Sequence, residues 1–140
     1  MGMLVEISTE SGFLHVRAKG DFSLVEAKRT FVEMLEAVAR NKVQKVLFDG
    51  QELVGNPRTI ERFYYGEFAA EAVAKFKDRG MDRATQFAYV LKVPLLDPGR
   101  FGETVAVNRG MFVKTFDNLD DALGWLGIAS ANNPDACDGK

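Results

Sequence analysis

The order in which strand-like and helix-like segments follow one another constrains the fold of this chain more than any other feature. Alternating apolar and polar residues predict two strands first, at 4–8 and 13–18. Helical and strand patterns then alternate up to a short amphipathic helix near Trp125, which gives the order ββαβαβαβα. Strands joined through helices run parallel by right-handed crossovers, whereas the first two strands form an antiparallel hairpin. We therefore expect an α/β domain with a mixed, mostly parallel five-stranded sheet and about four helices.

The first predicted helix has a clear start and one apolar face. Ser23 and Glu26 have the spacing of a capping box, in which each side chain accepts a backbone N–H at the helix start. Apolar residues then recur at helical spacing and predict a buried stripe formed by Leu24, Ala27, Phe31, Leu35 and Val38. A nearly continuous apolar run at 43–49 predicts a central strand that is covered on both faces.

The later boundaries are predicted from caps and helix breakers. Residues 51–58 are expected to form a loop, with Asn56 as the cap of the second helix and Pro57 at its first position. That helix covers about 57–79 and ends at Gly80. The remaining elements are a strand at 86–93, a third helix that starts at Asp97 and Pro98 and closes at Gly110, a strand at 111–116, and a last helix capped by Asp117 or Asn118.

The pattern predicts one domain of residues 1–128 and a disordered polar tail of residues 129–140. The 140 residues of the chain suffice for one such domain with a sizeable core. Cys137 is the single cysteine and cannot form an intrachain disulfide, so we expect a reducing, cytoplasmic location. No apolar run reaches the ~18 residues of a membrane span. Residues 1–10 lack the pattern of a secretory signal.

Composition argues against several classes of function. Eighteen Lys and Arg face twenty Asp and Glu, so the chain lacks the basic footprint of a nucleic-acid-binding protein. One histidine and one cysteine cannot supply a typical zinc site. Acyl transfer would have to use His15, which the alternating pattern places on the face of a strand. No phosphate-binding loop of a known type is present. We expect a non-enzymatic protein without a metal or cofactor.

Three segments carry a resemblance to a known family. The sequences VLFDG, DPGRFGETVAVNRG and DALGWL, together with the element order, resemble the SpoIIAA-like proteins, a branch of the STAS-like fold. The resemblance covers roughly residues 3–127. It implies a small cytoplasmic, homodimeric domain that binds partners or ligands and does no catalysis. Some members of this branch have been associated with apolar ligands or membranes.

One function of the family is tested by a short motif. Anti-sigma-factor antagonists of this fold carry a phosphorylatable Ser or Thr in an Asp-Ser-Ser/Thr-Gly turn before the helix that follows the central strand. The same region of this chain lacks the motif and reads Gly55, Asn56, Pro57, Arg58, Thr59. Thr59 is the one hydroxyl nearby and is expected at about the third helical position, where a helix N-terminus would stabilise a phosphate. We interpret it as an ordinary first-turn residue and predict no phosphoswitch.

The second predicted helix is unusually aromatic. A helix cannot direct Phe63, Tyr64, Tyr65 and Phe68 into one narrow stripe, so at least one ring is expected outside the core. Gly66 in the helix interior costs roughly 1 kcal/mol relative to Ala, which suggests that something packs closely against the backbone. Two interpretations remain open: these features fit the helix to the sheet, or they form a partner surface or an apolar pocket.

The third predicted helix carries Arg100, Phe101 and Arg109, which form either an anion or partner site or a solvated face with a weak internal salt bridge. The favoured hypothesis is a regulatory or protein-interaction module that forms a homodimer and binds a further, unknown protein. The alternative is a carrier or sensor of a small apolar or lipid-like ligand, with peripheral membrane association as a further option. That alternative requires a cavity between the second and third helices and the sheet, lined by residues such as Phe63, Phe68 and Phe101.

Overall fold

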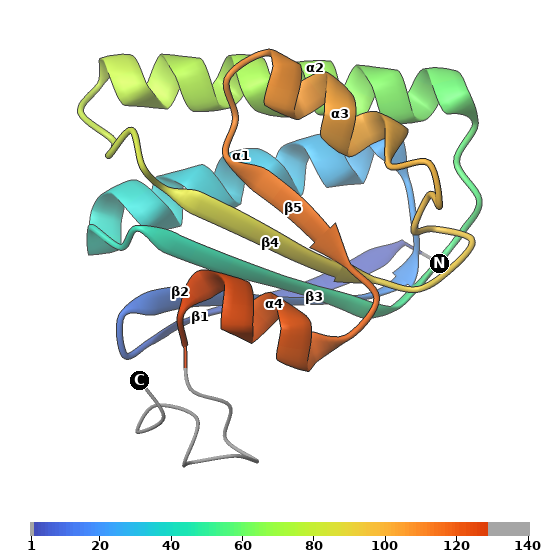
Figure 1. Cartoon of the computed structure of the whole chain (residues 1–140), viewed down its shortest axis with the longest axis horizontal. Coiled ribbons are helices and arrows are strands. Elements are labelled where there is room, and N and C mark those ends of the chain that lie inside the picture. The colour runs from blue at the N-terminus through green and yellow to red at the C-terminus, as the bar shows by residue number, and fades with distance from the viewer. Residues whose placement is uncertain (1, 129–140) are drawn as a thin grey trace.

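Five strands form one sheet, and their order in space follows their order in the sequence. The structure is a computed structural model that describes residues 2–128, so the predicted tail of residues 129–140, with Cys137, lies outside the described residues. β1 and β2 pair antiparallel, and every later pair is parallel, as predicted. The strands are β1 (Met3–Glu10), β2 (Phe13–Asp21), β3 (Lys45–Val54), β4 (Gln86–Leu91) and β5 (Val113–Phe116) (Figure 1).

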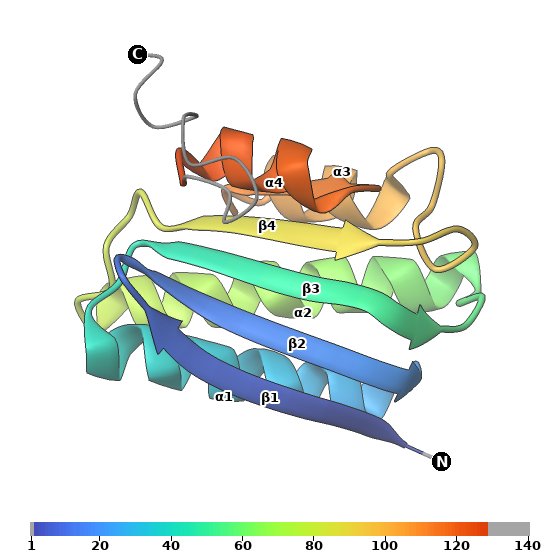
Figure 2. The same cartoon turned by 90° about the horizontal axis from the view of Figure 1, so that it is seen from below.

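The helices cover the two faces of the sheet unequally. Three of them lie on one face, here called the helical face: α1 (Leu24–Asn41), α2 (Thr59–Asp78) and α3 (Phe101–Asn108). The other face is covered by α4 (Leu119–Leu126) and is called the α4 face (Figures 1 and 2). The predicted α/β class, the mixed five-stranded sheet and the element order are confirmed.

Strand alternation divides the apolar residues between two cores. Val46 and Phe48 of β3 point to the helical face and join a large cluster with α1 and α2. Leu47, between them, points to the α4 face and packs with Ala88 and Leu126 in a smaller cluster. The two-residue period of a strand requires this division, because successive side chains leave opposite faces of a sheet.

The start of α1 is capped as predicted on one side only. The Ser23 hydroxyl accepts the Glu26 backbone N–H at 3.4 Å. The reciprocal half of the predicted capping box is wrong, because the Glu26 carboxylate instead accepts the backbone N–H of Met3 at 2.8 Å. Glu26 therefore ties the first residue of the sheet to the first turn of α1. The predicted apolar stripe is confirmed from Ala27 to Val38, whereas Leu24 at its start is only half-buried.

The predicted loop at 51–58 is wrong at its start, because β3 continues to Val54. β2 also runs past its predicted end at residue 18, to Asp21, and a register shift after Arg17 lets its last residues pair with the end of β3. The prediction of Asn56 and Pro57 as the start of α2 is wrong as well. α2 begins at Thr59, and the Glu61 carboxylate accepts the Arg58 backbone N–H at 2.8 Å.

The start of α3 also lies later than predicted. The helix begins at Phe101 and is preceded by Arg100 in the left-handed region, with φ of 54°. Asp97 nevertheless caps the helix from a distance, because its carboxylate accepts the backbone N–H of Phe101 at 2.8 Å and that of Gly99 at 3.2 Å. The prediction of a cap at Asp97 was therefore right about the chemistry and wrong about the boundary. The predicted cap of α4 is confirmed at Asn118.

Candidate functional site

A largely apolar cavity lies between the helical face of the sheet and the helices that cover it. Its volume is about 130 Å³. The walls come from the sheet, from α1, α2 and α3, and from the segment between β4 and α3. Apolar side chains form most of the lining, among them Phe48, Leu53, Leu95, Leu96 and Met111. A cavity in the place that the carrier hypothesis requires is therefore present.

The polar groups of the cavity wall include a pair of tyrosines. The hydroxyl oxygens of Tyr65 on α2 and Tyr89 on β4 lie 2.7 Å apart and share a hydrogen bond. The Tyr89 ring stacks on Phe48, with ring centroids 4.8 Å apart, and Tyr65 meets Tyr89 edge to face. Burial raises the pKa of both phenols, so both stay protonated over the physiological pH range. The pair is a neutral hydrogen-bonding group within an apolar enclosure.

Gly66 allows α2 and α3 to approach each other closely. A Cβ atom added to Gly66 would lie 2.6 Å from the carbonyl oxygen of Gly102 and 3.2 Å from the Cβ of Val105. Both Gly66 and Gly102 line the cavity. The interpretation that something packs against the backbone of this glycine is confirmed, and the packing element is α3.

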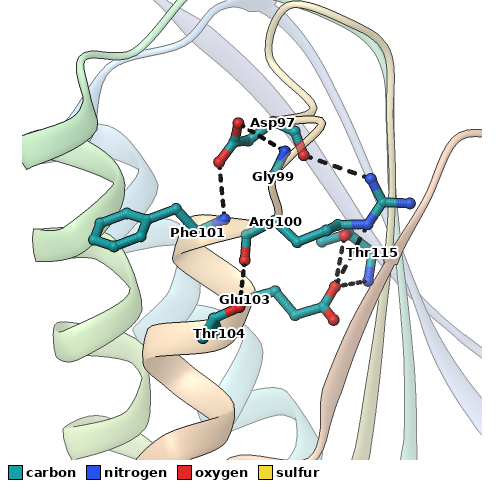
Figure 3. Close-up of polar contacts among 7 residues, drawn as sticks. All are labelled: Asp97, Gly99, Arg100, Phe101, Glu103, Thr104 and Thr115. Atoms are coloured by element: carbon teal, nitrogen blue, oxygen red, sulfur yellow. Dashed lines mark hydrogen bonds and ion pairs between the residues drawn. The ribbon is translucent and has the colours of Figure 1, made fainter.

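A polar cluster fixes the start of α3 to the end of the sheet (Figure 3). The Glu103 carboxylate accepts the backbone N–H of Thr115 at 2.8 Å and its hydroxyl at 2.7 Å. Arg100 lies 3.9 Å from the same carboxylate and directs a second contact to the Asp97 carbonyl oxygen. The Phe101 backbone N–H, ahead of a lesser contribution from Gly99, lowers the pKa of Asp97. The structure thus shows the Arg100 guanidinium paired within the chain.

Arg62 holds the segment between β4 and α3 against α2. Its guanidinium donates hydrogen bonds to the carbonyl oxygens of Leu95 at 2.8 Å and Pro94 at 2.9 Å. Leu95 and Leu96 are buried and line the cavity from this segment. Sequence reasoning missed Arg62 and Tyr89, because both act through partners more than 20 residues away in the chain. The helix-interior glycine and the crowded rings of α2 were the sequence signals near them.

The aromatic side chains of α2 point in different directions. Tyr65 faces the core, whereas Tyr64 is 46% exposed and confirms that at least one ring lies outside it. The Arg109 guanidinium carbon lies 5.4 Å from the centroid of the Phe63 ring, and Lys28 covers Phe68 at 5.3 Å. The predicted residues are therefore divided among the core, the α3 side and the α1 side of α2.

The expectation that Phe63, Phe68 and Phe101 line the cavity is wrong, because other residues form its walls. Phe101 is instead 39% exposed and extends toward α2 (Figure 3). Phe68 packs partly against the main core, and Phe63 contacts the Tyr64 ring edge to face at 5.9 Å. Helix geometry gives the reason, since the face of α2 that meets the sheet carries Tyr65 and Ala69.

Thr59 is the first residue of α2 and is exposed, two positions earlier in the helix than predicted. Within residues 2–128 no group of three or more His, Cys, Asp or Glu side chains is placed to hold a metal ion. Among the described helices, none is both long enough and apolar enough to cross a membrane.

Solved structures with a similar architecture are known. The structure is similar to that of an anti-sigma factor antagonist from Mycobacterium paratuberculosis, with a TM-score of 0.56 and 15% sequence identity over 89% of this chain and 94% of that chain. A second similar structure is an uncharacterized protein with a SpoIIAA-like fold from Shewanella loihica, with a TM-score of 0.48 and 20% identity over 89% of this chain and 93% of that chain. No protein-family model matches the sequence, and no curated protein matches it. The predicted SpoIIAA/STAS-like fold is confirmed.

Proposed function

We propose that this protein is a regulatory protein-interaction module that acts without catalysis and forms a homodimer through α2 and α3. Ile60, Tyr64 and Phe101, here called the outer apolar surface, carry the proposal. They are 45%, 46% and 39% exposed, respectively, and come from two helices packed against each other. Exposed aromatic rings of this kind are enriched at protein interfaces. The solved structure with the same fold is named as an anti-sigma factor antagonist, which supports a protein partner.

The proposed first partner is a second copy of this chain. Glu67 and Arg109 lie 3.7 Å apart beside the Phe63 ring, and both side chains are about 40% exposed. In a two-fold contact each carboxylate can pair with the guanidinium of the other copy, so the surface is complementary in charge to itself. A two-fold dimer is the commonest closed assembly of soluble proteins. A chain with a single cysteine forms no intrachain disulfide, which supports action in the reducing cytoplasm.

Sedimentation equilibrium tests the homodimer. We expect the native chain to sediment as a dimer at high micromolar concentration and the Tyr64→Ser variant to sediment as a monomer. Tyr64→Phe is the matched control, because it keeps the ring and removes an exposed hydroxyl. A monomeric native chain, or a dimer that Tyr64→Ser leaves unchanged, contradicts the proposed surface.

Thr59 is proposed to have no switching role, because the phosphorylation motif of the resembling family is missing around it. Thr59 is the first residue of α2, directly after Arg58, and is exposed. Intact-mass measurement of the chain isolated from its native host should show less than stoichiometric phosphate at Thr59. Full phosphorylation there would overturn this part of the proposal.

A second candidate function, the binding of a small apolar ligand, is favoured by the cavity of about 130 Å³. Sites for small ligands are typically apolar pockets with a few polar groups, and this cavity combines an apolar lining with the Tyr65–Tyr89 pair. Native mass spectrometry of protein purified from cells reports subunit number and retained ligand together. We expect a retained small molecule that denaturation releases. A native mass equal to that of the bare polypeptide under gentle conditions contradicts this candidate.

A further inference from the structure

The hydroxyl groups on the cavity wall are not all used. A hydrogen bond between the Tyr65 and Tyr89 hydroxyls consumes one of their two protons. The second proton has no acceptor among the residues that the structure describes. A buried donor without an acceptor is costly, and such groups are rare in folded proteins. The tyrosine pair can therefore donate one further hydrogen bond.

A third hydroxyl on the same wall is also without a partner. Thr30 on α1 lines the cavity and is 6% exposed. Its hydroxyl makes no hydrogen bond with any residue between 2 and 128. Thr30 is an independent observation, because it lies on a different helix from Tyr65 and makes no hydrogen bond to the tyrosine pair. Hydroxyl groups from α1, α2 and β4 that can form a further hydrogen bond therefore line one apolar cavity.

The ionisable residues of the cavity wall are already paired. The wall contains two arginines, Arg62 and Arg100, and three carboxylates, Glu61, Asp97 and Glu103. Arg62 is bound to two backbone carbonyl groups, and Arg100 contacts Glu103. No guanidinium on this wall is free among the described residues, and the carboxylates outnumber the arginines. A ligand anion would therefore lose its hydration without gaining a cation.

The volume sets the size of the ligand. A cavity of about 150 Å³ in another protein binds benzene, whereas sites for drug-sized ligands have volumes of about 300–1,000 Å³. The 130 Å³ cavity of this chain is slightly smaller than the benzene-binding one and is therefore suited to a molecule about one ring in size. A long fatty-acid chain exceeds it.

We infer that the cavity binds a small, uncharged, mostly apolar molecule, about one ring in size, whose single carbonyl-type oxygen accepts a hydrogen bond from the Tyr65–Tyr89 pair. This inference rests on the second candidate function and names its ligand class. Thr30 supplies a second hydroxyl for the same oxygen or for a neighbouring hydroxyl of the ligand. The phenols act as hydrogen-bond donors and position the ligand; no bond of the ligand is made or broken.

The test compares two probes of nearly equal shape by NMR titration, with the amide signals of Gly66 and Ala69 as reporters. Acetophenone carries a carbonyl group, and α-methylstyrene replaces that oxygen with a methylene group. In the double variant Tyr65→Phe/Tyr89→Phe we expect the Kd of acetophenone to rise about three- to tenfold. The Kd of α-methylstyrene should stay the same or fall. The ratio of these changes cancels the difference in hydrophobicity between the two probes.

Single variants sharpen the test. Tyr65→Phe or Tyr89→Phe alone leaves one hydroxyl that can still donate, so each should keep most of the acetophenone affinity. Tyr64→Phe, on the outer side of the same helix, is the matched control and should change neither probe's Kd. The double variant removes both partners of one hydrogen bond, which is usually close to neutral for stability, and its unfolding curve confirms that it folds.

The possible results distinguish a failure of the inferred ligand class from a failure of the apolar-ligand function on which it rests. If both probes bind the native chain and the double variant weakens neither or both equally, the inference is overturned and the apolar-ligand function stands. If neither probe shifts the reporter signals at millimolar concentration, both fall. If benzoate, the anionic probe of similar size, binds as tightly as acetophenone, the ligand is an anion and the inferred class is wrong.

Discussion

The two faces of the sheet are built differently. The helical face carries the larger core, in which Phe31 and Phe87 are fully buried, and it also encloses the cavity. The α4 face has a smaller core under one short helix, and its β1–β2 part has polar side chains such as His15 and Arg17. The face with the larger core is thus also the face with the cavity.

The contrast indicates that α2 is more than a cover for the sheet. α1 has one buried stripe against the sheet, whereas α2 packs against the sheet, α1 and α3 and still exposes Tyr64. The proposed partner surface, the tyrosine pair and the close approach at Gly66 all belong to this one helix. Substitutions on the two faces, and on the two sides of α2, can therefore separate packing from binding.

The largest expected effect comes from Phe31→Ala. The Phe31 ring is fully buried and contacts Phe87 of the sheet and Tyr65 of α2, with ring centroids 5.8 Å and 6.1 Å away. Removing it should lower the free energy of unfolding by about 3–5 kcal/mol, measured by urea denaturation. Val25→Ala, at a position 71% exposed on the same helix, should change it by less than ~0.5 kcal/mol. Equal losses in the two variants would mean that α1 is not packed as described.

Gly66→Ala should also destabilise the protein, although Ala is the better helix former by about 1 kcal/mol. The added Cβ would meet the Gly102 carbonyl oxygen, which is backbone and cannot turn away. Overpacking of this kind costs about 1–3 kcal/mol, so we expect a net loss of stability. A larger side chain such as Leu should cost more.

Gly124→Ala is the matched control for Gly66→Ala. Gly124 lies in α4, and a Cβ there would meet nothing within 4 Å. The substitution should raise the free energy of unfolding by about 0.4–1 kcal/mol, because only the helix propensity and the entropy of the unfolded chain change. If Gly66→Ala also stabilises the protein, α3 moves away from α2 easily, and the packing difference between Gly66 and Gly124 does not determine stability.

Asp97→Ala should cost about 1 kcal/mol, the usual price of losing a helix cap. Hydrogen bonds from Phe101 and Gly99 lower the pKa of Asp97 in the folded protein. Its stabilising effect is therefore present above the unfolded pKa of about 3.9 and is lost as the pH falls through the folded pKa. Stability curves of the native chain and the variant should approach each other in acid. Asp97→Asn, which keeps an acceptor oxygen, should lose less at pH 7, and an identical loss would point to charge alone.

Much of the fold could be predicted because local signals agree with the tertiary structure. The alternating strands, the single stripe of α1 and the cap at Asn118 each depend on residues close together in the chain. The start of α2 was misplaced because the Glu61 side chain, and not Asn56, satisfies the backbone there. The end of β3 was missed because its pairing with β2 depends on a register shift that the sequence does not mark.

The candidate site could be predicted only in outline. Gly66 and the crowded rings pointed to α2, because an interior glycine and rings that cannot share one stripe are visible in the sequence. The Tyr65–Tyr89 hydrogen bond joins residues 24 positions apart and depends on how α2 sits across β4. Arg62 likewise binds carbonyl oxygens 32 and 33 positions away. Such contacts follow from packing between elements, which periodicity does not specify.

The smallest expected effect concerns His15 on the α4 face. Its Nε2 atom is buried and has no hydrogen-bond partner among the described residues. Burial, with a further contribution from Arg17, lowers the pKa of His15, while Asp49 and Glu10 oppose that shift. The folded state therefore favours the neutral ring. The unfolded chain protonates first, at a pKa of about 6.5, so stability should fall as the pH drops below that value and level off below the folded pKa.

His15→Gln removes this titration and should flatten the stability curve below pH 6.5, as urea denaturation at pH 7.5 and 5.5 would show. On the helical face, the buried polar pair Tyr65 and Tyr89 stays neutral across this range. The double variant Tyr65→Phe/Tyr89→Phe should therefore keep the native pH slope while His15→Gln loses part of it. If the slope is the same in all three proteins, His15 does not titrate differently on folding. The change in stability between pH 7.5 and 5.5 would then come from groups other than His15.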